Sequence, residues 1–281
     1  MSRGSLQISR LGTLPYAEAL ELQNEIRAAR QAGGIEDTLL LLQHPPVYTR
    51  GRRTAEDELP MGQQWYEMQG IEVAETDRGG AVTYHGPGQV VAYPIIDLTN
   101  WGDDVHAYVR RLELVMIGAL AEHGVPAQVF EGLTGVWTAG QPPVAVGAVG
   151  PQGTPVGAPA EPGPPTDPGT PAAEARKIGS IGIHVSRGVT THGLAVNVSN
   201  DLQPFEWIVP CGIEYVRMTS VSRELGSEQN PDEFAETIAE QFASVFGVDV
   251  EPPPRKPAVV EAVEQDSDDD RSDQRLGEAA S

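Results

Sequence analysis

The stretch Arg78-Gly-Gly-Ala-Val-Thr-Tyr-His-Gly-Pro-Gly-Gln89 combines four glycines, a histidine and a tyrosine within twelve residues. Taken alone, this composition is typical of a tight turn between two strands. A phosphate loop is excluded, because the stretch contains neither GxxxxGK(S/T) nor GxGxxG. We interpret it as a glycine-lined wall that admits a flexible acyl chain and offers backbone N–H groups to an oxyanion.

Segments on both sides of this stretch predict an α/β domain. Residues 38–43 contain four consecutive leucines and predict a buried strand, which Pro45 and Pro46 end. Residues 89–97 predict a second strand, in which Pro94 suggests an edge position or a bulge. Apolar residues at helical spacing predict helices over residues 14–30, 103–123 and 231–246. Short glycine-punctuated strands are expected between residues 177 and 198.

Residues 139–176 differ in composition from the sequence on either side. They contain ten prolines and seven glycines and no aromatic residue. Such a stretch buries too little apolar surface to offset its ordering entropy, so we expect a disordered insertion rather than a linker between domains. The prediction is one catalytic domain over residues 1–250, which contains this insertion, followed by a disordered acidic tail over residues 251–281.

The chain is strongly acidic, with a formal net charge of −21 at pH 7. The tail has nine acidic and four basic residues, so most of the negative charge belongs to the domain. We expect no nucleic-acid partner, because phosphate binding needs a basic surface. The four-leucine run is too short to cross a bilayer, and the N-terminal residues do not resemble a signal peptide. We therefore expect a cytoplasmic protein with no membrane partner.

Cys211 is the single cysteine and lies in the sequence Ile208-Val-Pro-Cys-Gly-Ile213. One cysteine excludes an intramolecular disulfide and is compatible with a reducing cytoplasm. A free cysteine is most often a small buried hydrophobe. Pro210 and Gly212 instead favour a fixed, exposed turn, and a thiolate is both a good nucleophile and a good leaving group. Together with the glycine-rich stretch, this favours acyl transfer through a thioester on Cys211.

Lys177 is the second candidate catalytic residue. The only other lysine is Lys256, which lies in the predicted tail. A lone lysine is ordinarily a surface residue beside a strand. The other Lys/Arg positions are all arginines, which cannot exchange protons near neutral pH. If Lys177 lies near Cys211, its charge lowers the pKa of the thiol, and its amine can carry a proton during amine attack.

The six histidines include no closely spaced metal-binding pair and no HExxH sequence. His44, His85 and His192 stand beside proline or glycine in motif-like loops and are expected to line a site. His106 and His123 accompany a predicted helix and are expected to be structural. We expect no metal and no cofactor, with a zinc site assembled from distant histidines as an alternative. The scatter of the four tryptophans favours packing over nucleic-acid stacking.

Six motifs in this order resemble those of the octanoyltransferases of lipoate biosynthesis, the lipoyl(octanoyl) transferases. They span roughly residues 6 to 245, and the run Thr83-Tyr-His-Gly-Pro-Gly-Gln89 is the most specific piece. The long insertion before Lys177 and the acidic tail depart from the family pattern. The motifs are Gln43-His-Pro-Pro-Val-Tyr-Thr-Arg-Gly-Arg-Arg53, the 78–89 stretch, Gly135-Val-Trp137, Lys177-Ile-Gly-Ser-Ile-Gly182, His192-Gly-Leu-Ala-Val-Asn197 and Pro210-Cys-Gly212.

The resemblance implies an α/β domain like that of the biotin/lipoate protein ligases, with a mixed sheet and flanking helices. It implies that Cys211 takes the acyl group and that Lys177 pairs with it. It also implies substrate contacts from three segments. These residues are Arg78, Gly79, Gly80, Ala81, Val82, Thr83, Tyr84, His85, Ser180, Ile181, Gly182, Gly193, Leu194 and Ala195.

The implied reaction transfers an octanoyl group from octanoyl-acyl carrier protein to a lysine of a lipoyl domain. The implied acceptors are the lipoyl domains of 2-oxoacid dehydrogenase complexes and the glycine cleavage H protein. A thioester on Cys211 predicts ping-pong kinetics without nucleotide or metal. Both protein substrates are usually acidic, so docking requires a local basic patch, for which Arg50, Arg52, Arg53 and Arg78 are candidates.

Three other functions stay open from the residues themselves. An ATP-dependent lipoate or biotin ligase would share the fold but would activate a free acid and need no cysteine. A thioester hydrolase would pass the acyl group to water instead of lysine. A non-catalytic binder of acyl carrier protein would leave Cys211 unacylated.

Overall fold

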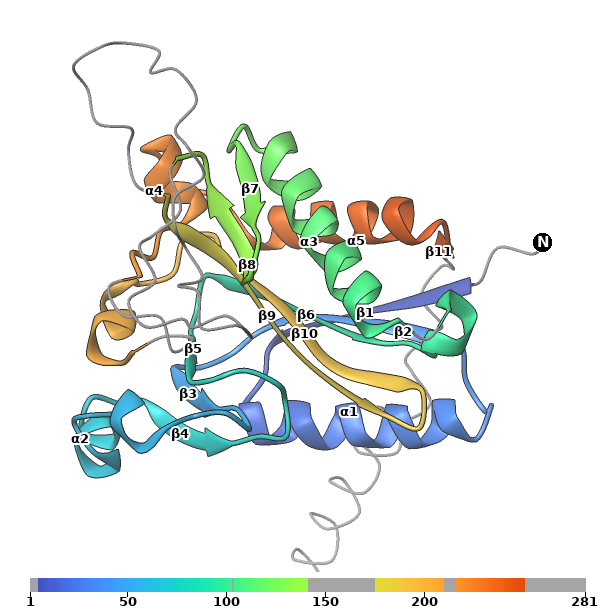
Figure 1. The fold of residues 1–281 in the computed structure, drawn as a ribbon, viewed down its shortest axis with the longest axis horizontal. Coiled ribbons are helices and arrows are strands. Elements are labelled where there is room, and N and C mark those ends of the chain that lie inside the picture. Colours follow the sequence, from blue (N-terminus) through green and yellow to red (C-terminus); the bar gives the residue numbers. More distant parts are fainter. Residues whose placement is uncertain (1–4, 103, 141–174, 210–215, 251–281) are drawn as a thin grey trace, which may run out of the picture.

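The computed structural model describes residues 5–102, 104–140, 175–209 and 216–250. Its centre is an eight-stranded mixed sheet with strand order β11-β1-β2-β6-β10-β9-β8-β7 (Figure 1). Strand β1 pairs in parallel with β2 and β11, and the other neighbours pair antiparallel. The strands are β1 (Ser5–Thr13), β2 (Asp37–Gln43), β6 (Gln89–Ile95), β7 (Ala127–Phe130), β8 (Leu133–Thr138), β9 (Lys177–Ser186), β10 (Val189–Asn197) and β11 (Asp249–Val250).

A smaller sheet with order β4-β3-β5 lies on the same side of the main sheet as helix α1 (Figure 1). Its aromatic core includes Tyr48, Tyr66, Tyr84 and Phe205. Because these rings come from two strands, a short helix and a 3-10 turn, they hold the smaller sheet together as one unit. The elements of this unit are β3 (Val47–Arg50), η1 (Glu56–Glu58), α2 (Gln63–Met68), β4 (Glu72–Glu75), β5 (Thr83–His85) and η3 (Gln203–Trp207).

Helix α1 (Tyr16–Gln31) covers one face of the main sheet, and α3 (Val105–Glu122) and α5 (Pro231–Phe246) cover the other (Figure 1). These helices confirm the three that apolar spacing predicts. Short elements η2 (Leu98–Trp101) and α4 (Val221–Leu225) complete the description. Among the described residues, no helix is both long and apolar enough to cross a bilayer.

The ends of α3 and α5 follow from local sequence. Asp104 accepts the His106 N–H (2.8 Å) and begins α3. Asn230 accepts the Asp232 N–H (2.9 Å), and the proline at the first position of α5 has no N–H to leave unpaired. Gly247, with φ +62°, ends α5 in the left-handed conformation that glycine adopts readily.

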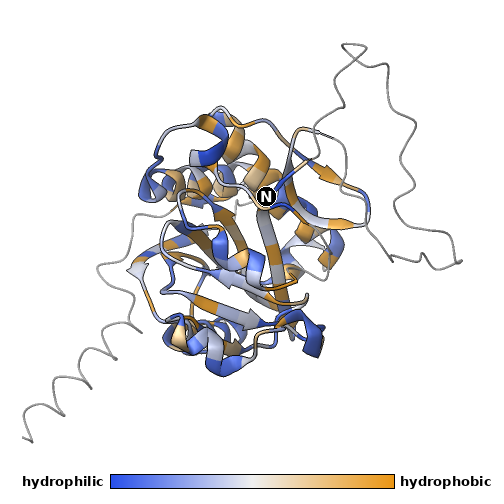
Figure 2. Ribbon diagram, turned by 90° about the vertical axis from the view of Figure 1, so that its left-hand side faces the viewer, coloured by the Kyte–Doolittle hydropathy of each residue, from blue (hydrophilic) through white to orange (hydrophobic). Residues whose placement is uncertain are grey.

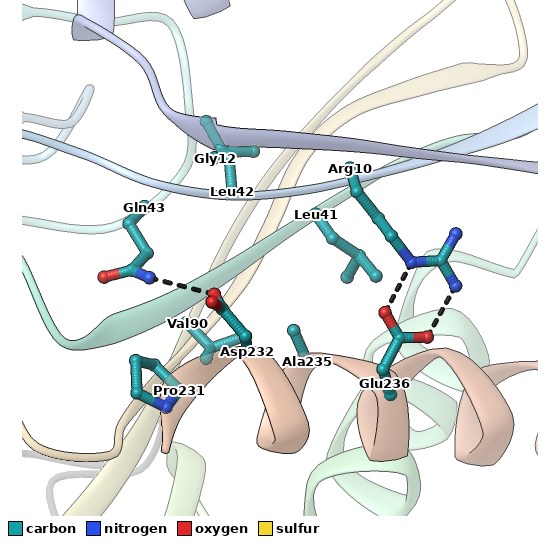
Figure 3. Close-up of a pocket in the computed structure, with 10 residues that line it drawn as sticks. All are labelled: Arg10, Gly12, Leu41, Leu42, Gln43, Val90, Pro231, Asp232, Ala235 and Glu236. Carbon is teal, nitrogen blue, oxygen red and sulfur yellow. Dashed lines mark hydrogen bonds and ion pairs between the residues drawn. The ribbon is translucent and has the colours of Figure 1, made fainter.

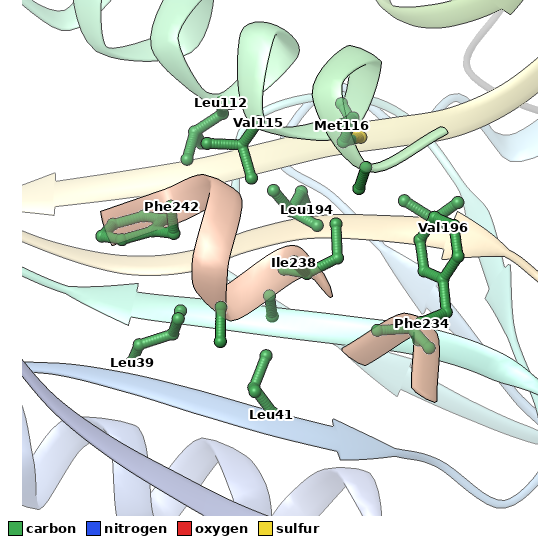
Figure 4. Close-up of a cluster of buried hydrophobic side chains, with 14 of the residues drawn as sticks. Leu39, Leu41, Leu112, Val115, Met116, Leu194, Val196, Phe234, Ile238 and Phe242 are labelled. Carbon is green, nitrogen blue, oxygen red and sulfur yellow. The ribbon is translucent and has the colours of Figure 1, made fainter. Parts of the chain in front are cut away.

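The largest core lies between the main sheet and the α3/α5 pair (Figure 4). From α5, Phe234, Ile238 and Phe242 pack inward at four-residue spacing, and Leu112 and Met116 face them from α3. A second core lies beneath α1. The helices carry hydrophilic residues on their outer sides and hydrophobic residues where they face the sheet (Figure 2). The predicted α/β class is confirmed.

The position of Pro94 differs from the prediction. Strand β6 lies in the interior of the sheet, between β2 and β10, so the edge-strand interpretation is wrong. The pairing of β6 with β10 reaches only Ala92 and Leu194. Beyond that point β10 is irregular at His192, whose φ is +57°. Pro94 therefore lies where β10 no longer continues the ladder, and its missing N–H is tolerated.

Strands β8 and β9 are neighbours, and the Pro/Gly-rich segment connects them. At its neck, Thr138 N donates to Arg176 O (2.8 Å), and Arg176 N donates to Thr138 Oγ1 (3.0 Å). The Arg176 side chain also pairs with Glu224 (2.7 Å). The segment thus leaves and returns at one point of the sheet. Residues 141–174 lie outside the described residues, and their disorder stays a prediction.

Candidate active site

Lys177 is the first residue of β9, and only 2 % of its surface is exposed. Its Nζ lies 5.5 Å from the ring centre of Trp137, the residue that pairs with it on β8. An ammonium near the face of an indole is attracted by the quadrupole of the ring. The ordinary surface-lysine interpretation is therefore wrong, whereas the catalytic role of Lys177 stays a prediction.

The segment that carries Cys211 lies outside the described residues, and the role of Cys211 stays a prediction. Lys177 is nevertheless joined to the chain that follows this segment. Its N–H donates to Arg217 O (2.8 Å), and its carbonyl oxygen accepts the Thr219 N–H (2.9 Å). Met218 thus forms an isolated parallel β-bridge with Lys177 at the start of β9.

Buried polar side chains connect this junction to the glycine-rich stretch. Asn197 Nδ2 donates to Thr219 O (3.0 Å), and Gln89 Nε2 donates to Asn197 Oδ1 (2.8 Å). Gln89 Oε1 accepts in turn from His85 Nδ1 (2.7 Å). Because buried polar groups need partners, this network accounts for a glutamine and an asparagine at the ends of two sequence motifs. Sequence reasoning assigned neither amide a role.

Arg78 holds the loop between β4 and β5. Its guanidinium donates to Thr49 O (2.6 Å), Thr49 Oγ1 (2.7 Å), Ala81 O (2.8 Å) and Gly79 O (3.2 Å). The residue is only 7 % exposed. A planar fork of donors suits several acceptors at once, which favours arginine over lysine. Arg78 therefore holds the backbone of the predicted wall in place. Because the residue is buried, its predicted role in the basic docking patch is wrong.

The structure brings the three predicted substrate-contact segments together. In β9 and β10, Gly182 pairs with Gly193, Ile181 with Leu194 and Ser180 with Ala195. The glycine-rich loop lies against Gly182, where an added Cβ would be 2.9 Å from Arg78 Cδ and 3.1 Å from Gly79 O. Gly79 N also donates to Ile183 O (2.8 Å). Whether these residues contact substrate stays a prediction.

The structure limits which side chains and which backbone N–H groups of these segments can face a substrate. Leu194 belongs to the core beneath α3 and α5, and Ile181 packs against that core, so both side chains lie on the face away from the loop. Several backbone donors of the predicted wall already have partners. Val82 N donates to Glu58 Oε2 (3.0 Å), and Gly88 N donates to Gln43 Oε1 (2.7 Å). The wall therefore does not offer all of its N–H groups to an oxyanion.

Two histidines and two tyrosines form a buried cluster. His44 Nδ1 donates to Leu14 O (2.7 Å), so His44 Nε2 accepts the Tyr93 hydroxyl (2.8 Å). The Tyr16 ring centre lies 5.3 Å from that of His44 and 6.4 Å from that of His85. Burial lowers the pKa of His44 to about 4 and holds the pKa of His85 well below its usual value. Both imidazoles are neutral at pH 7, which suits a wall rather than proton exchange.

The third predicted site histidine, His192, pairs with a carboxylate. His192 Nε2 donates to Asp77 Oδ1 (2.7 Å), and His184 Nε2 lies 3.5 Å from the other oxygen of that carboxylate. The hydrogen bond from His192 lowers the pKa of Asp77 to about 2. Burial lowers the pKa of His192, although Asp77 opposes this shift. Sequence reasoning missed Asp77, because a single loop aspartate carries no distinguishing local signal.

The remaining arginines of the predicted docking patch differ in exposure. Arg52 and Arg53 are exposed, whereas Arg50 is partly buried and pairs with Glu75 (2.8 Å). The exposed pair lies beside the glycine-rich loop, since Arg52 N donates to Arg78 O (3.0 Å). The patch is thus reduced to two exposed arginines next to the predicted substrate wall.

A cavity on the face of the main sheet that α5 covers is a poor candidate for the acyl site. It lies between β1, β2 and α5, where Gln43 meets Asp232 (3.4 Å) and Arg10 pairs with Glu236 (Figure 3). Its volume of about 80 Å³ is far below the roughly 300 Å³ of a typical small-molecule site. Within the described residues, no group of three His, Cys, Asp or Glu side chains could hold a metal ion.

Comparison with known proteins identifies the family. The family model described as Lipoyl protein ligase A/B catalytic domain matches residues 15–243. The chain belongs to this family. It is 44 % identical to an octanoyltransferase of Mycolicibacterium smegmatis over 234 residues, which are 83 % of this chain and 86 % of the relative. It is 40 % identical to an octanoyltransferase of Solibacter usitatus over 245 residues, covering 87 % and 94 % of the two chains.

Solved structures of lipoate protein ligases share the fold. The bipartite lipoate protein ligase of Thermoplasma acidophilum aligns with a TM-score of 0.62 at 17 % identity, covering 95 % of this chain and 92 % of the ligase. A lipoate-protein ligase A bound with ATP aligns with a TM-score of 0.60 at 16 % identity, covering 94 % of each chain. The predicted ligase-like fold is confirmed. Because the curated relatives are octanoyltransferases, this family member is an acyltransferase.

Proposed function

We propose that this family member transfers an octanoyl group from octanoyl-acyl carrier protein to a lysine of a lipoyl domain, through an octanoyl thioester on Cys211. The observation that carries the proposal is the burial of Lys177 beside residues 217–219, which follow Cys211 closely in the sequence. The names of the relatives support octanoate as the acyl group. The archaeal ligase, described together with its E2 lipoyl domain, supports a lipoyl domain as the acceptor.

In the first half-reaction, Lys177 takes the proton of the Cys211 thiol. The thiolate attacks the carbonyl carbon of the octanoyl thioester, and a tetrahedral oxyanion forms. The carbon–sulfur bond to the phosphopantetheine arm then breaks, and the departing thiolate recovers the proton from Lys177. The products are octanoyl-Cys211 and free acyl carrier protein.

In the second half-reaction, the lipoyl-domain lysine attacks as a neutral amine. It forms a carbon–nitrogen bond to the octanoyl carbon while the bond to the sulfur of Cys211 breaks. Lys177 accepts the proton that the attacking nitrogen loses and returns it to the Cys211 thiolate. The products are the octanoyl amide and the free enzyme.

The surroundings of Lys177 suit this exchange. Its buried side chain is kept from bulk water, which favours transfer to an amine over transfer to water. Only five residues separate Cys211 from Arg217 in the sequence, and the Arg217 carbonyl oxygen accepts the Lys177 N–H, so a short piece of chain connects the proposed nucleophile to a direct partner of Lys177. The neutral His44 and His85 add no competing base at pH 7.

The test is the intact mass of the protein after incubation with octanoyl-acyl carrier protein in the absence of an acceptor. We expect one added octanoyl group, absent in Cys211→Ser, and its loss when a lipoyl domain gains the same mass. Lys177→Met should slow both steps. Octanoylation of the lipoyl domain by Cys211→Ser, from ATP and free octanoate, would instead identify an ATP-dependent ligase.

A further inference from the structure

The Lys177 side chain packs against Gly135, a position that only glycine can occupy. A Cβ added to Gly135 of β8 would be 3.0 Å from Lys177 Cε and 3.4 Å from Lys177 Nζ. It would also be 2.5 Å from Gly179 O, a backbone atom of β9. The φ of Gly135 is +105°, a conformation that residues with a side chain rarely adopt. The missing side chain of Gly135 leaves room for the Lys177 side chain, and glycine also allows the positive φ at this position.

The unusual backbone of Gly135 belongs to an irregularity in β8. Gln128 of β7 pairs with Trp137, and Phe130 pairs with Leu133. One residue of β7 thus faces three residues of β8, and Gly135 is the middle one. Extra residues in a strand lose their ladder partners, so a bulge of this kind needs another acceptor for its N–H.

Glu113 of α3 supplies that acceptor. Its Oε1 accepts the Gly135 N–H (3.1 Å), and its Oε2 accepts Nη1 of Arg110 (2.8 Å). Glu113 is only 2 % exposed, and its helix neighbours Leu112 and Met116 belong to the apolar core. A buried carboxylate is costly unless it is paired, so its presence on the core side of an amphipathic helix calls for a structural reason.

We propose that Glu113 is a positioning residue for Lys177 and acts through the Gly135 bulge. The carboxylate holds the Gly135 N–H, the fixed bulge keeps the φ of Gly135 positive, and the bare Cα leaves room for Lys177 Cε and Nζ. The inference rests on the proposed role of Lys177 as the proton carrier. It assigns to α3, which is distant in sequence from both proposed catalytic residues, the task of aligning the amine.

Three substitutions test this chain of contacts. Glu113→Gln keeps an oxygen that can accept the Gly135 N–H, and we expect the rate of Cys211 acylation to stay within about twofold. Glu113→Met has a similar size but no strong acceptor, and Gly135→Ala fills the space of the amine. For both we expect a fall of about 100-fold in kcat with little change in KM for octanoyl-acyl carrier protein, because small displacements of a reacting group have effects of this size.

The pH profile separates positioning from general damage to the fold. Glu113→Met and Gly135→Ala should change the pH profile of the rate in the same way as Lys177→Met does. Leu120→Ala is the matched control, because Leu120 is a fully buried residue of the same helix and lies about two turns beyond Glu113. It should lower the urea midpoint and retain both kcat and the wild-type pH profile.

The outcomes distinguish the inference from the function on which it rests. Full activity of Lys177→Met would overturn the proposed role of the lysine. An inactive Lys177→Met, together with wild-type kcat and pH profile in Glu113→Met, would overturn the inference alone. If Gly135→Ala does not fold, the comparison of Glu113→Gln with Glu113→Met still decides, because both leave Gly135 in place.

Discussion

Replacement of Arg78 by methionine should mainly lower the free energy of unfolding and should have a smaller effect on substrate affinity. The substitution removes the donors to three carbonyl oxygens, those of Thr49, Gly79 and Ala81, and to the Thr49 hydroxyl. A buried polar group left without a partner costs about 1–3 kcal/mol. Water reaches part of this loop, so we take the lower end for the three carbonyls and expect a loss of about 3 kcal/mol.

The assay is urea unfolding followed by tryptophan fluorescence at pH 7. A domain of ordinary stability, about 5–15 kcal/mol, stays folded after such a loss, so activity can be measured on the folded variant. Arg53→Met is the matched control, because Arg53 is an exposed arginine on the segment that the loop contacts. Its stability should change by less than about 0.5 kcal/mol.

One result would refute the role that the structure gives Arg78. If Arg78→Met had wild-type stability but a KM for the octanoyl thioester raised tenfold or more, the guanidinium would serve the substrate rather than the loop. That outcome would support the substrate contact that the sequence predicts for Arg78.

Three further results are expected. His44 should contribute a fall of about 3 kcal/mol to the free energy of unfolding as the pH drops from 6.5 to about 4, since the unfolded chain takes up a proton that buried His44 does not bind, and His85 adds a fall of the same sign; a His44→Gln variant that kept the full wild-type slope would contradict the reasoning. Gly193→Ala should lower stability by at least about 2 kcal/mol, because its Cβ would lie 2.2 Å from a carbonyl oxygen of β6, whereas Gly34→Ala should have little effect; equal urea midpoints would contradict this. Replacement of Arg52 and Arg53 by Ser should raise KM for octanoyl-acyl carrier protein more than for a small octanoyl thioester, and equal effects would exclude docking.

The sequence predicts best those elements whose signals are local. Helix α5 has the predicted bounds, because Asn230, Pro231 and Gly247 determine its ends and phenylalanines at four-residue spacing determine its buried face. The glycine-rich stretch, β9 and β10 were expected to form one site, and the structure places them in contact. The glycines in these motifs indicate where the backbone must turn or approach another segment closely, so the motifs can be recognised from the sequence alone.

The rest of the site depends on contacts that no local pattern encodes. Arg78 has the charge of a surface residue, and only the carbonyl groups that surround it show that it is an internal clamp. Tyr16 and Tyr93 join the histidine cluster from a helix and a strand far apart in the sequence. Glu113 did carry a signal, since a carboxylate interrupts the apolar face of α3, but its partner Gly135 could not be inferred from that interruption.

The hydrogen bonds between Thr138 and Arg176 make the stability of the main sheet nearly independent of the length of the connection between β8 and β9. These bonds hold the two ends of the connection at the edge of the strand pair. The entropy of closing a loop rises by only about 0.6 kcal/mol for each doubling of its length. A change in the length of this connection should therefore alter the stability of the sheet only slightly. Lys177 follows directly after Arg176, so the same hydrogen bonds also fix the start of β9, where a Cβ on Gly135 would come within 3.0 Å of Lys177 Cε.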